Sequence, residues 1–289
     1  MSTLSLYKEL LDVEVFVDIE RLRDSARRYG VPEEMRGIVW KYLLGVESPD
    51  RSKEITRIKA HEEEYNLIDK SDSVFTKRIR GELSRYSRRL NIRFPKELST
   101  VFENVVCAYL VHTHSMRGGG GYTSALVSLC GPFVFVFGWE KEMDIYYCFE
   151  MLMQILSDYS TAHPINERVA SFITLFRTAL PDLYMYFDEE EVNDEWITNW
   201  LQYLLSKELR MENLLRLWDT YFSISDFLDF HPYVCLAILK HFKEDLEELE
   251  HSEIRTLLMR LPLFDMEQII NQAFSIRSEI LERQILDYV

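Results

Sequence analysis

Arginine and glutamate side chains recur along one predicted helix at a spacing that places them on a common face. Arg78, Glu82, Arg85 and Arg89 follow one another at steps of 4, 3 and 4 residues. Residues three or four apart meet on a helix surface, so Glu82 can restrain the guanidiniums of Arg78 and Arg85. An oriented guanidinium supplies positive charge of the kind that phosphoryl transfer requires at a γ-phosphate. A solvent-exposed face laced with ion pairs has the same pattern, and spacing alone does not separate the two.

A glycine-rich segment follows about thirty residues further along the chain. Gly118 to Gly121 are four of the ten glycines, and Tyr122 comes next. Contiguous glycines permit tight backbone approach but also flexibility. No lysine follows at the spacing of a phosphate-binding loop. The sequence therefore does not predict that this chain hydrolyses a nucleotide itself.

Four motifs together resemble the TBC domain, the Rab-type GTPase-activating fold. They are Arg36-x-x-x-Trp40, Ile79-x-x-Glu82-x-x-Arg85, Gly121-Tyr122-Thr123-Ser124-Ala125 and Trp218-Asp219. The resemblance runs from about residue 30 to about residue 250. It implies an all-α, V-shaped TBC/RabGAP helical domain made of two helical subdomains, spanning 30–250 with a seam near 158–166. Residues 1–29 are then an N-terminal helical extension, and residues 251–289 are C-terminal helices that pack on the domain.

The resemblance assigns roles to four residues. Arg85 corresponds to the arginine finger of the family, and Glu82 stands where the family has an aspartate that orients this arginine. Tyr122 matches the second motif, in which a glutamine positions the attacking water. Ser124 occupies the place of that glutamine. Because serine is shorter and lacks an amide, the second finger is degraded in this chain.

The sequence supports two functional hypotheses from different classes and a third alternative. The first is a GTPase activator in trans, which accelerates GTP hydrolysis by a Rab-like small GTPase through Arg85. The second is a catalytically weak or inactive TBC scaffold that binds a small GTPase or a partner subunit. The third is a helical adaptor that dimerises through Asp265–Val289, although the apolar stripe there also fits an intramolecular core.

The resemblance also implies the partners. GTP and Mg²⁺ belong to the GTPase, which binds in its GTP state, so the chain itself needs no cofactor or metal; a regulatory protein subunit is a further expected partner. Residues Cys107-Ala108-Tyr109, Gly131-Pro132-Phe133 and Tyr147-Cys148-Phe149 look most like the branch of the family that acts in mitotic exit and septation. We therefore expect roles in vesicle trafficking or the cell cycle, with recruitment to membranes or spindle poles through partners.

Composition narrows the class of protein. The formal net charge of −15 disfavours non-specific binding to nucleic acid or to anionic membranes. The sequence contains no run of about 18 apolar residues, so we do not predict a transmembrane span. The four cysteines lack metal-ligand spacing and lie in apolar contexts, which predicts buried free thiols and a cytoplasmic location.

Helical periodicity dominates the chain. Besides the arginine helix, we predict helices over the ranges 143–156, 168–179, 195–207, 211–222, 232–249, 252–260 and 265–288. Ser252 is the predicted N-cap of the helix that follows it. The short alternation Val134–Phe137 is expected to end or link helices near Gly138, and His231 is expected at a helix entry before Pro232.

Overall fold

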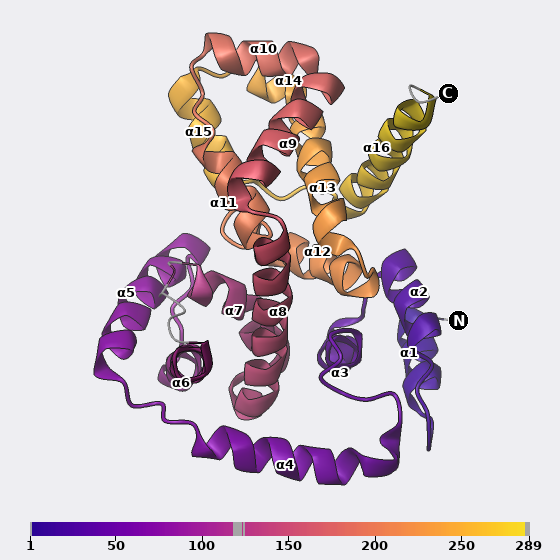
Figure 1. The fold of residues 1–289 in the computed structure, drawn as a ribbon, viewed down its shortest axis with the longest axis vertical. Coiled ribbons are helices and arrows are strands. Elements are labelled where there is room, and N and C mark those ends of the chain that lie inside the picture. Colours follow the sequence, from indigo (N-terminus) through magenta and orange to yellow (C-terminus); the bar gives the residue numbers. More distant parts are fainter. Residues whose placement is uncertain (1, 118–122, 124, 287–289) are drawn as a thin grey trace. The chain divides into compact units, whose positions relative to one another are not determined.

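The computed structural model describes residues 2–117, 123 and 125–286. This part of the chain is all-α, as predicted, and its β-structure is confined to one isolated bridge between Phe16 and Asp50. The chain divides into two compact units, residues 1–156 and 157–289 (Figure 1). The division falls inside one helix, whereas the predicted seam near 158–166 begins two residues later and stays a prediction.

Unit 1 is built around an almost fully buried helix, α7 (Leu126–Phe137). Around it lie α3, α5 and α6, each packed against α7. Trp40 of α3 meets Phe133 of α7 edge to face at 5.6 Å between ring centroids, and both rings are fully buried. The helices of this unit are α1 (Thr3–Leu11), α2 (Ile19–Tyr29), α3 (Glu33–Leu43), α4 (Glu54–Leu67), α5 (Ser73–Leu90), α6 (Lys96–Arg117), α7 and the first part of α8 (Glu142–Ala162), with short 3₁₀ turns at Arg51–Lys53 and Trp139–Lys141.

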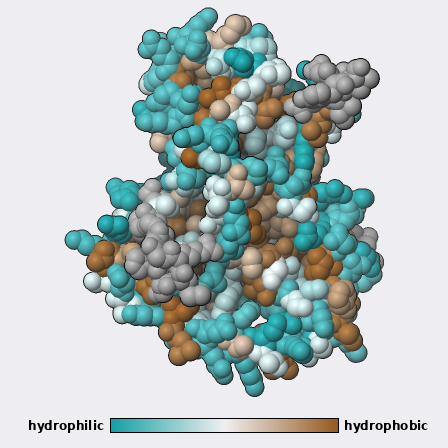
Figure 2. Space-filling view, in the orientation of Figure 1, coloured by the Kyte–Doolittle hydropathy of each residue, from teal (hydrophilic) through white to brown (hydrophobic). Residues whose placement is uncertain are grey.

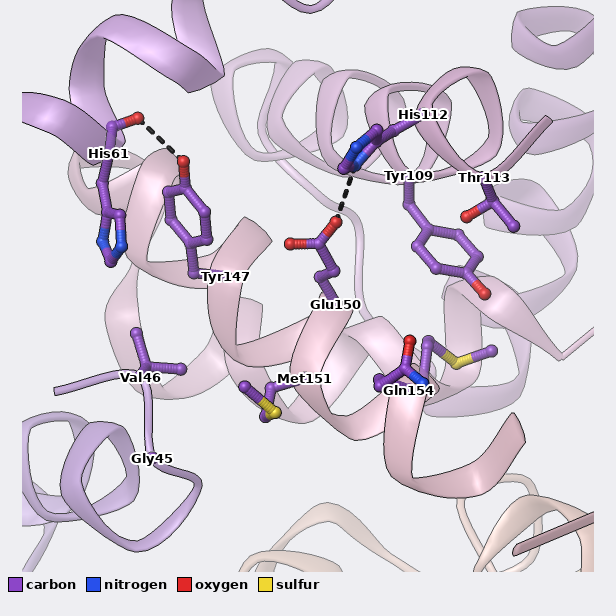
Figure 3. A pocket seen from close by; sticks show the side chains of 11 residues that line it. Gly45, Val46, His61, Tyr109, His112, Thr113, Tyr147, Glu150, Met151 and Gln154 are labelled. Atoms are coloured by element: carbon purple, nitrogen blue, oxygen red, sulfur yellow. Dashed lines mark hydrogen bonds and ion pairs between the residues drawn. The ribbon is translucent and has the colours of Figure 1, made fainter. Parts of the chain in front are cut away.

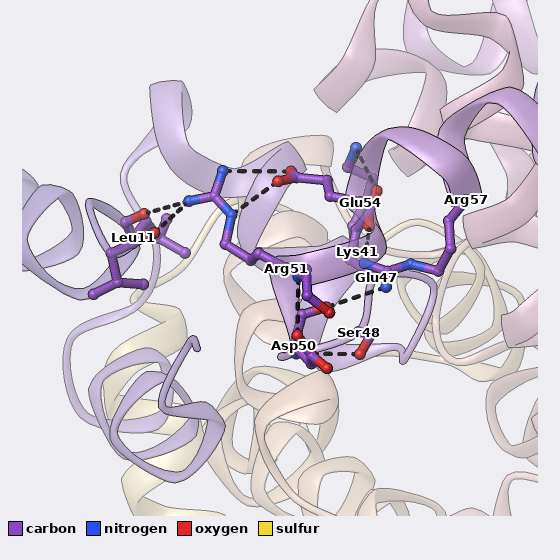
Figure 4. A network of polar contacts seen from close by, with 10 residues as sticks. Leu11, Lys41, Glu47, Ser48, Asp50, Arg51, Glu54 and Arg57 are labelled. Carbon is purple, nitrogen blue, oxygen red and sulfur yellow. Dashed lines mark hydrogen bonds and ion pairs between the residues drawn. The ribbon is translucent and has the colours of Figure 1, made fainter. Parts of the chain in front are cut away.

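The N-terminal residues are tied into unit 1 by polar contacts. The Tyr7 hydroxyl is buried and donates to the carbonyl of Gly30 at 2.9 Å. The Arg51 guanidinium donates to the carbonyl of Val13 at 2.8 Å. It also forms an ion pair with Glu54 at 2.9 Å (Figure 4). The described N-terminal residues thus contact the rest of unit 1.

Unit 2 has an aromatic core. Phe172, Phe176 and Phe187 surround Trp196, which meets Trp200 edge to face at 4.9 Å between centroids. Its helices are the remainder of α8, α9 (Ile165–Ala179), α10 (Pro181–Glu189), α11 (Glu195–Tyr203), α12 (Met211–Ser223), α13 (Phe227–His241), α14 (Lys243–Leu246), α15 (His251–Met259) and α16 (Met266–Leu286).

Three local predictions were wrong. The single helix predicted over 232–249 is two helices, and α13 begins five residues before Pro232, so His231 lies inside the helix instead of at its entry. The cap of α15 is not Ser252: the side chains of Glu250 and Glu253 reciprocally accept from each other's backbone N–H groups. By contrast, the prediction that residues 134–137 end a helix near Gly138 is confirmed: they form the last turn of α7, which ends at Gly138 with φ of +72°.

Most of the apolar side chains along the C-terminal helix, α16, are buried. Met266, Ile269, Ile270 and Ala273 of α16 are each at most 4% exposed. They lie on a helix that packs against α13 of the same unit. This part of the apolar stripe is therefore intramolecular core, the alternative that the sequence favoured. Leu281 at its far end is 43% exposed, and dimerisation through the helix stays an untested alternative.

Hydrophilic side chains cover most of the face seen in Figure 2, with apolar residues in separate patches, which fits the acidic composition. All four cysteines are buried and free, as predicted. Within the described residues, no helix is both long enough and apolar enough to cross a membrane.

Candidate functional site

Helix α5 begins and ends at recognisable capping residues. The Asp72 carboxylate accepts from the N–H groups of Val74 and Phe75 at 2.8 and 2.9 Å, which satisfies two of the free donors of the first turn. At the other end, Asn91 adopts the left-handed conformation with φ of +56°. Asparagine is one of the few non-glycine residues that tolerate this region, so the helix stops there.

The two faces of α5 differ in exposure. Ile79, Leu83 and Tyr86, spaced four and three residues apart, are buried and form an apolar stripe along one face. Glu82 is 6% exposed, so its carboxylate lies on the buried side of the helix. Arg85, three residues later, is exposed. The structure therefore places the predicted pair on one helix, with the acid inside and the arginine outside.

The guanidinium of Arg85 lies back along the helix toward Gly81. A methyl group built on Gly81 would come 4.0 Å from Nη1 of Arg85, an ordinary van der Waals separation. Among the described residues, no carboxylate forms an ion pair with Arg85, whereas Arg80 on the same helix makes a bidentate pair with Glu103 at 2.8 Å for both bonds. Arg85 thus keeps donors for a ligand, while the orienting role of Glu82 stays a prediction.

A close helix contact fixes the turn of α5 that carries Arg85. The neighbouring Tyr86 packs its ring against Gly131 of α7, so closely that a methyl group on Gly131 would lie 2.0 Å from the tyrosine hydroxyl oxygen. Only glycine permits this approach. Neither Tyr86 nor Gly131 was predicted from the sequence as a residue of the site. The available signal was Gly131, which lies in a buried helix where glycine is otherwise unfavourable.

The second predicted pair, Tyr122 and Ser124, lies outside the described residues. Of that motif, Thr123 is exposed, and Ala125 is fully buried just before α7 begins. The motifs Arg36-x-x-x-Trp40 and Trp218-Asp219 have structural roles. Arg36 donates to the carbonyl of Val31 at 2.8 Å, and the Trp40 and Trp218 side chains are fully buried.

The chain resembles known proteins along most of its length. Residues 33–247 match the sequence model of the Rab-GTPase-TBC domain. The GTPase-activating protein gyp1 of Schizosaccharomyces pombe is 26% identical over 95% of this chain, and the human TBC1 domain family member 22A is 27% identical over 90% of it. The chain spans only 60% and 56% of the lengths of these two relatives.

Solved structures show the same fold. The crystal structure of the Ypt/Rab-GAP domain of Gyp1p superposes with a TM-score of 0.80 at 22% identity, covering 97% of this chain and 100% of that one. The TBC domain of a Chlamydomonas flagellar RabGAP gives a TM-score of 0.70 at 18% identity, covering 94% and 89%. The predicted mitotic-exit branch finds no support in these names and stays a prediction.

Proposed function

The chain belongs to the Rab-GTPase-TBC domain family, and we propose on that basis that it accelerates GTP hydrolysis by a Rab-like small GTPase in its GTP state. GTP and Mg²⁺ are bound by that partner, and this chain supplies protein groups in trans. The two relatives are longer than this chain, so the identity of the GTPase and any regulatory subunit belong to the proposal. The same holds for a cytoplasmic site of action and for recruitment to membranes or spindle poles.

One observation carries the catalytic part of the proposal. Arg85 is exposed on a helix whose opposite face is buried, and it has no ion-pair partner among the described residues. A planar guanidinium with several free donors can bind the oxygens of a γ-phosphate while charge redistributes during hydrolysis. In Ras-type systems such an arginine raises the rate by on the order of 10³ to 10⁵.

The second finger decides between two forms of the proposal. Ser124 cannot position a water molecule as a glutamine amide does, because its side chain is shorter and offers no amide. Either the GTPase uses its own glutamine with Arg85, or the chain binds the GTPase without accelerating hydrolysis. The preserved, exposed Arg85 favours the first form.

Single-turnover GTP hydrolysis by a panel of purified Rab-like GTPases tests the proposal. We expect the wild-type chain to accelerate at least one of them, and Arg85→Ala to remove on the order of 10³ of that acceleration. Arg88→Ala is the matched control, because Arg88 is an exposed arginine one turn further along the same helix. It should keep the wild-type rate.

The alternative has a separate readout in the same samples. Unaccelerated hydrolysis across the panel, combined with binding that requires GTP, would identify the scaffold. Acceleration that survives Arg85→Ala would contradict the role of Arg85 while leaving the activity intact. In the Ser124→Gln variant, a higher rate with a GTPase lacking its own glutamine would show that the second site can be restored.

A further inference from the structure

Unit 1 contains a cavity of about 360 Å³ that the proposed function does not use. Its walls come from the loop after α3 and from α4, α6 and α8, and no residue of α5 lines it (Figure 3). The volume lies within the range of ordinary small-ligand sites, roughly 300 to 1,000 Å³. It is therefore large enough for a compact ligand and separate from the helix of Arg85.

One carboxylate in this cavity is held by two donors on the same oxygen. The Tyr146 hydroxyl donates to Oε1 of Glu150 at 2.8 Å. Nδ1 of His112 lies 2.8 Å from the same oxygen and 3.0 Å from the Tyr146 hydroxyl. Since that hydroxyl already donates to Glu150, the imidazole reaches Oε1 as an Nδ1–H donor.

The other carboxylate oxygen has a different environment. No described side chain makes a hydrogen bond to Oε2 of Glu150. In Figure 3 this oxygen points away from His112, toward the side of the cavity where Tyr147 and His61 lie. Two donors thus fix the carboxylate in place, and its second oxygen is available to a ligand.

The walls around Glu150 are aromatic and apolar. The Tyr147 ring stacks on the His61 ring at 4.2 Å between centroids, and its hydroxyl is engaged with the His61 carbonyl at 2.9 Å. Tyr109 and Met151 also line the cavity. Aromatic faces attract cations, and apolar side chains take the stem that carries them.

We propose that this cavity binds an organic cation, an ammonium or guanidinium group on an apolar stem, through Oε2 of Glu150 and the ring of Tyr147. Neither lysine nor arginine is among the described residues that line the cavity, so no ammonium or guanidinium group of the lining competes for Oε2 of Glu150. The net charge of −15 further favours cationic over anionic ligands. A free amine and a lysine or arginine side chain of a protein share this chemistry.

Methyl NMR of the full chain with labelled methionines can test the proposal, because Met151 and Met153 line the cavity while Met185 is exposed in unit 2. We would titrate 4-phenylbutylammonium and its neutral counterpart 4-phenylbutanol at pH 8, above the range in which histidines usually titrate. The ammonium should shift the Met151 and Met153 signals saturably and leave Met185 unmoved. The alcohol should bind at least about tenfold more weakly, since its hydroxyl can still donate to the carboxylate but carries no positive charge.

Two variants assign the effect to Glu150. Glu150→Gln removes the charge but keeps an oxygen for Tyr146 and His112, and it should weaken binding of the ammonium about tenfold. Glu140→Gln removes an equal charge at an exposed position outside the cavity and should leave binding unchanged. A peptide with one lysine, compared with its acetyl-lysine form, distinguishes a protein side chain from a free amine as the natural ligand.

The proposal fails if the alcohol binds as tightly as the ammonium. It also fails if Glu150→Gln binds like wild type or if only Met185 responds. The comparison of ammonium with alcohol uses wild-type protein, so it remains decisive even if the variant is unstable.

Discussion

Two buried polar side chains, one in each unit, differ in how they are paired. In unit 2, His231 is fully buried and both ring nitrogens have partners: Nε2 donates to the Trp200 carbonyl at 2.7 Å, and Nδ1 lies 2.5 Å from the Tyr221 hydroxyl. In unit 1, the buried Tyr86 hydroxyl has no hydrogen-bond partner within the described residues. Buried polar groups in natural proteins are usually paired, so the unit 1 arrangement costs stability.

The difference distinguishes polar side chains that only stabilise the fold from polar side chains that can bind a ligand. The His231 cluster is saturated by its own neighbours, which leaves no group for a ligand. In unit 1, the Tyr86 hydroxyl at the α5–α7 contact has no hydrogen-bond partner among the described residues. In the same unit, Oε2 of Glu150 faces a cavity. We infer that the His231 cluster serves the fold, whereas Glu150 of unit 1 serves binding. Full pairing is not general in unit 2, because Nδ2 of Asn213 is buried without a hydrogen-bond partner among the described residues.

The largest expected effect on stability comes from closing the glycine contact. In Gly131→Ala the new methyl would overlap the Tyr86 hydroxyl, 2.0 Å away, so the two helices must separate. Overpacking of this kind costs about 3 kcal/mol. Urea unfolding measures it, and GTPase stimulation should fall as well because α5 moves. An unchanged unfolding midpoint would show that the contact is not tight.

His231 makes unit 2 sensitive to acid. Burial lowers the pKa of this histidine to about 4, with the nearby Arg168 acting in the same direction. The unfolded chain therefore takes up the proton first, so the stabilisation is complete above pH 6.5 and is lost as the pH falls toward 4. The loss amounts to about 3 kcal/mol.

Comparison with a variant isolates this contribution from the carboxylates that titrate nearby. His231→Gln should be less stable at pH 7 but should lose less stability than wild type between pH 6.5 and 4. Urea unfolding at several pH values gives both curves. Parallel curves would rule out a buried neutral histidine as the cause.

A smaller, stabilising effect is expected at Tyr86. Tyr86→Phe removes a buried hydroxyl that lacks a partner and keeps the ring, so stability should rise by about 1 kcal/mol. The matched substitution in unit 2, Tyr221→Phe, removes a paired hydroxyl and should destabilise by a similar amount. If both substitutions stabilised the chain, or both destabilised it, the difference in pairing between the Tyr86 and Tyr221 hydroxyls would be wrong.

The smallest effect concerns Gly81. Gly81→Ala adds a methyl at 4.0 Å from Nη1 of Arg85, with no steric conflict, and replaces a poor helix former. We expect a gain of about 0.5–1 kcal/mol with GTPase stimulation retained. Thermal unfolding and the hydrolysis assay check both, and the contrast with Gly131→Ala separates helix propensity from helix contact.

Local patterns predicted much of the fold but not its contacts. The stripe of α5 and the bounds of α12 follow from helical periodicity. The start of α13 was missed because Pro232 was taken as a helix start. A proline early in a helix removes a single hydrogen bond, which the surrounding core can offset.

The candidate site was predictable only in part. Motif resemblance identified Arg85 and Glu82 on one helix. It did not reveal that Tyr86 needs a glycine opposite it, since this contact joins residues 45 positions apart. The cavity likewise collects His61, His112 and Glu150 from three helices, and no sequence spacing brings these together.

If Arg85 stabilises the transition state of GTP hydrolysis by the partner GTPase, this chain should bind a mimic of that state tightly. GDP with aluminium fluoride mimics the transferring phosphoryl group, and a transition-state stabiliser binds such a mimic more tightly than the ground state. We predict that this chain binds a responsive GTPase much more tightly when aluminium fluoride accompanies GDP, and that Arg85→Ala loses this gain while Arg88→Ala keeps it. Equal gains in wild type and Arg85→Ala would show that Arg85 does not stabilise the transition state.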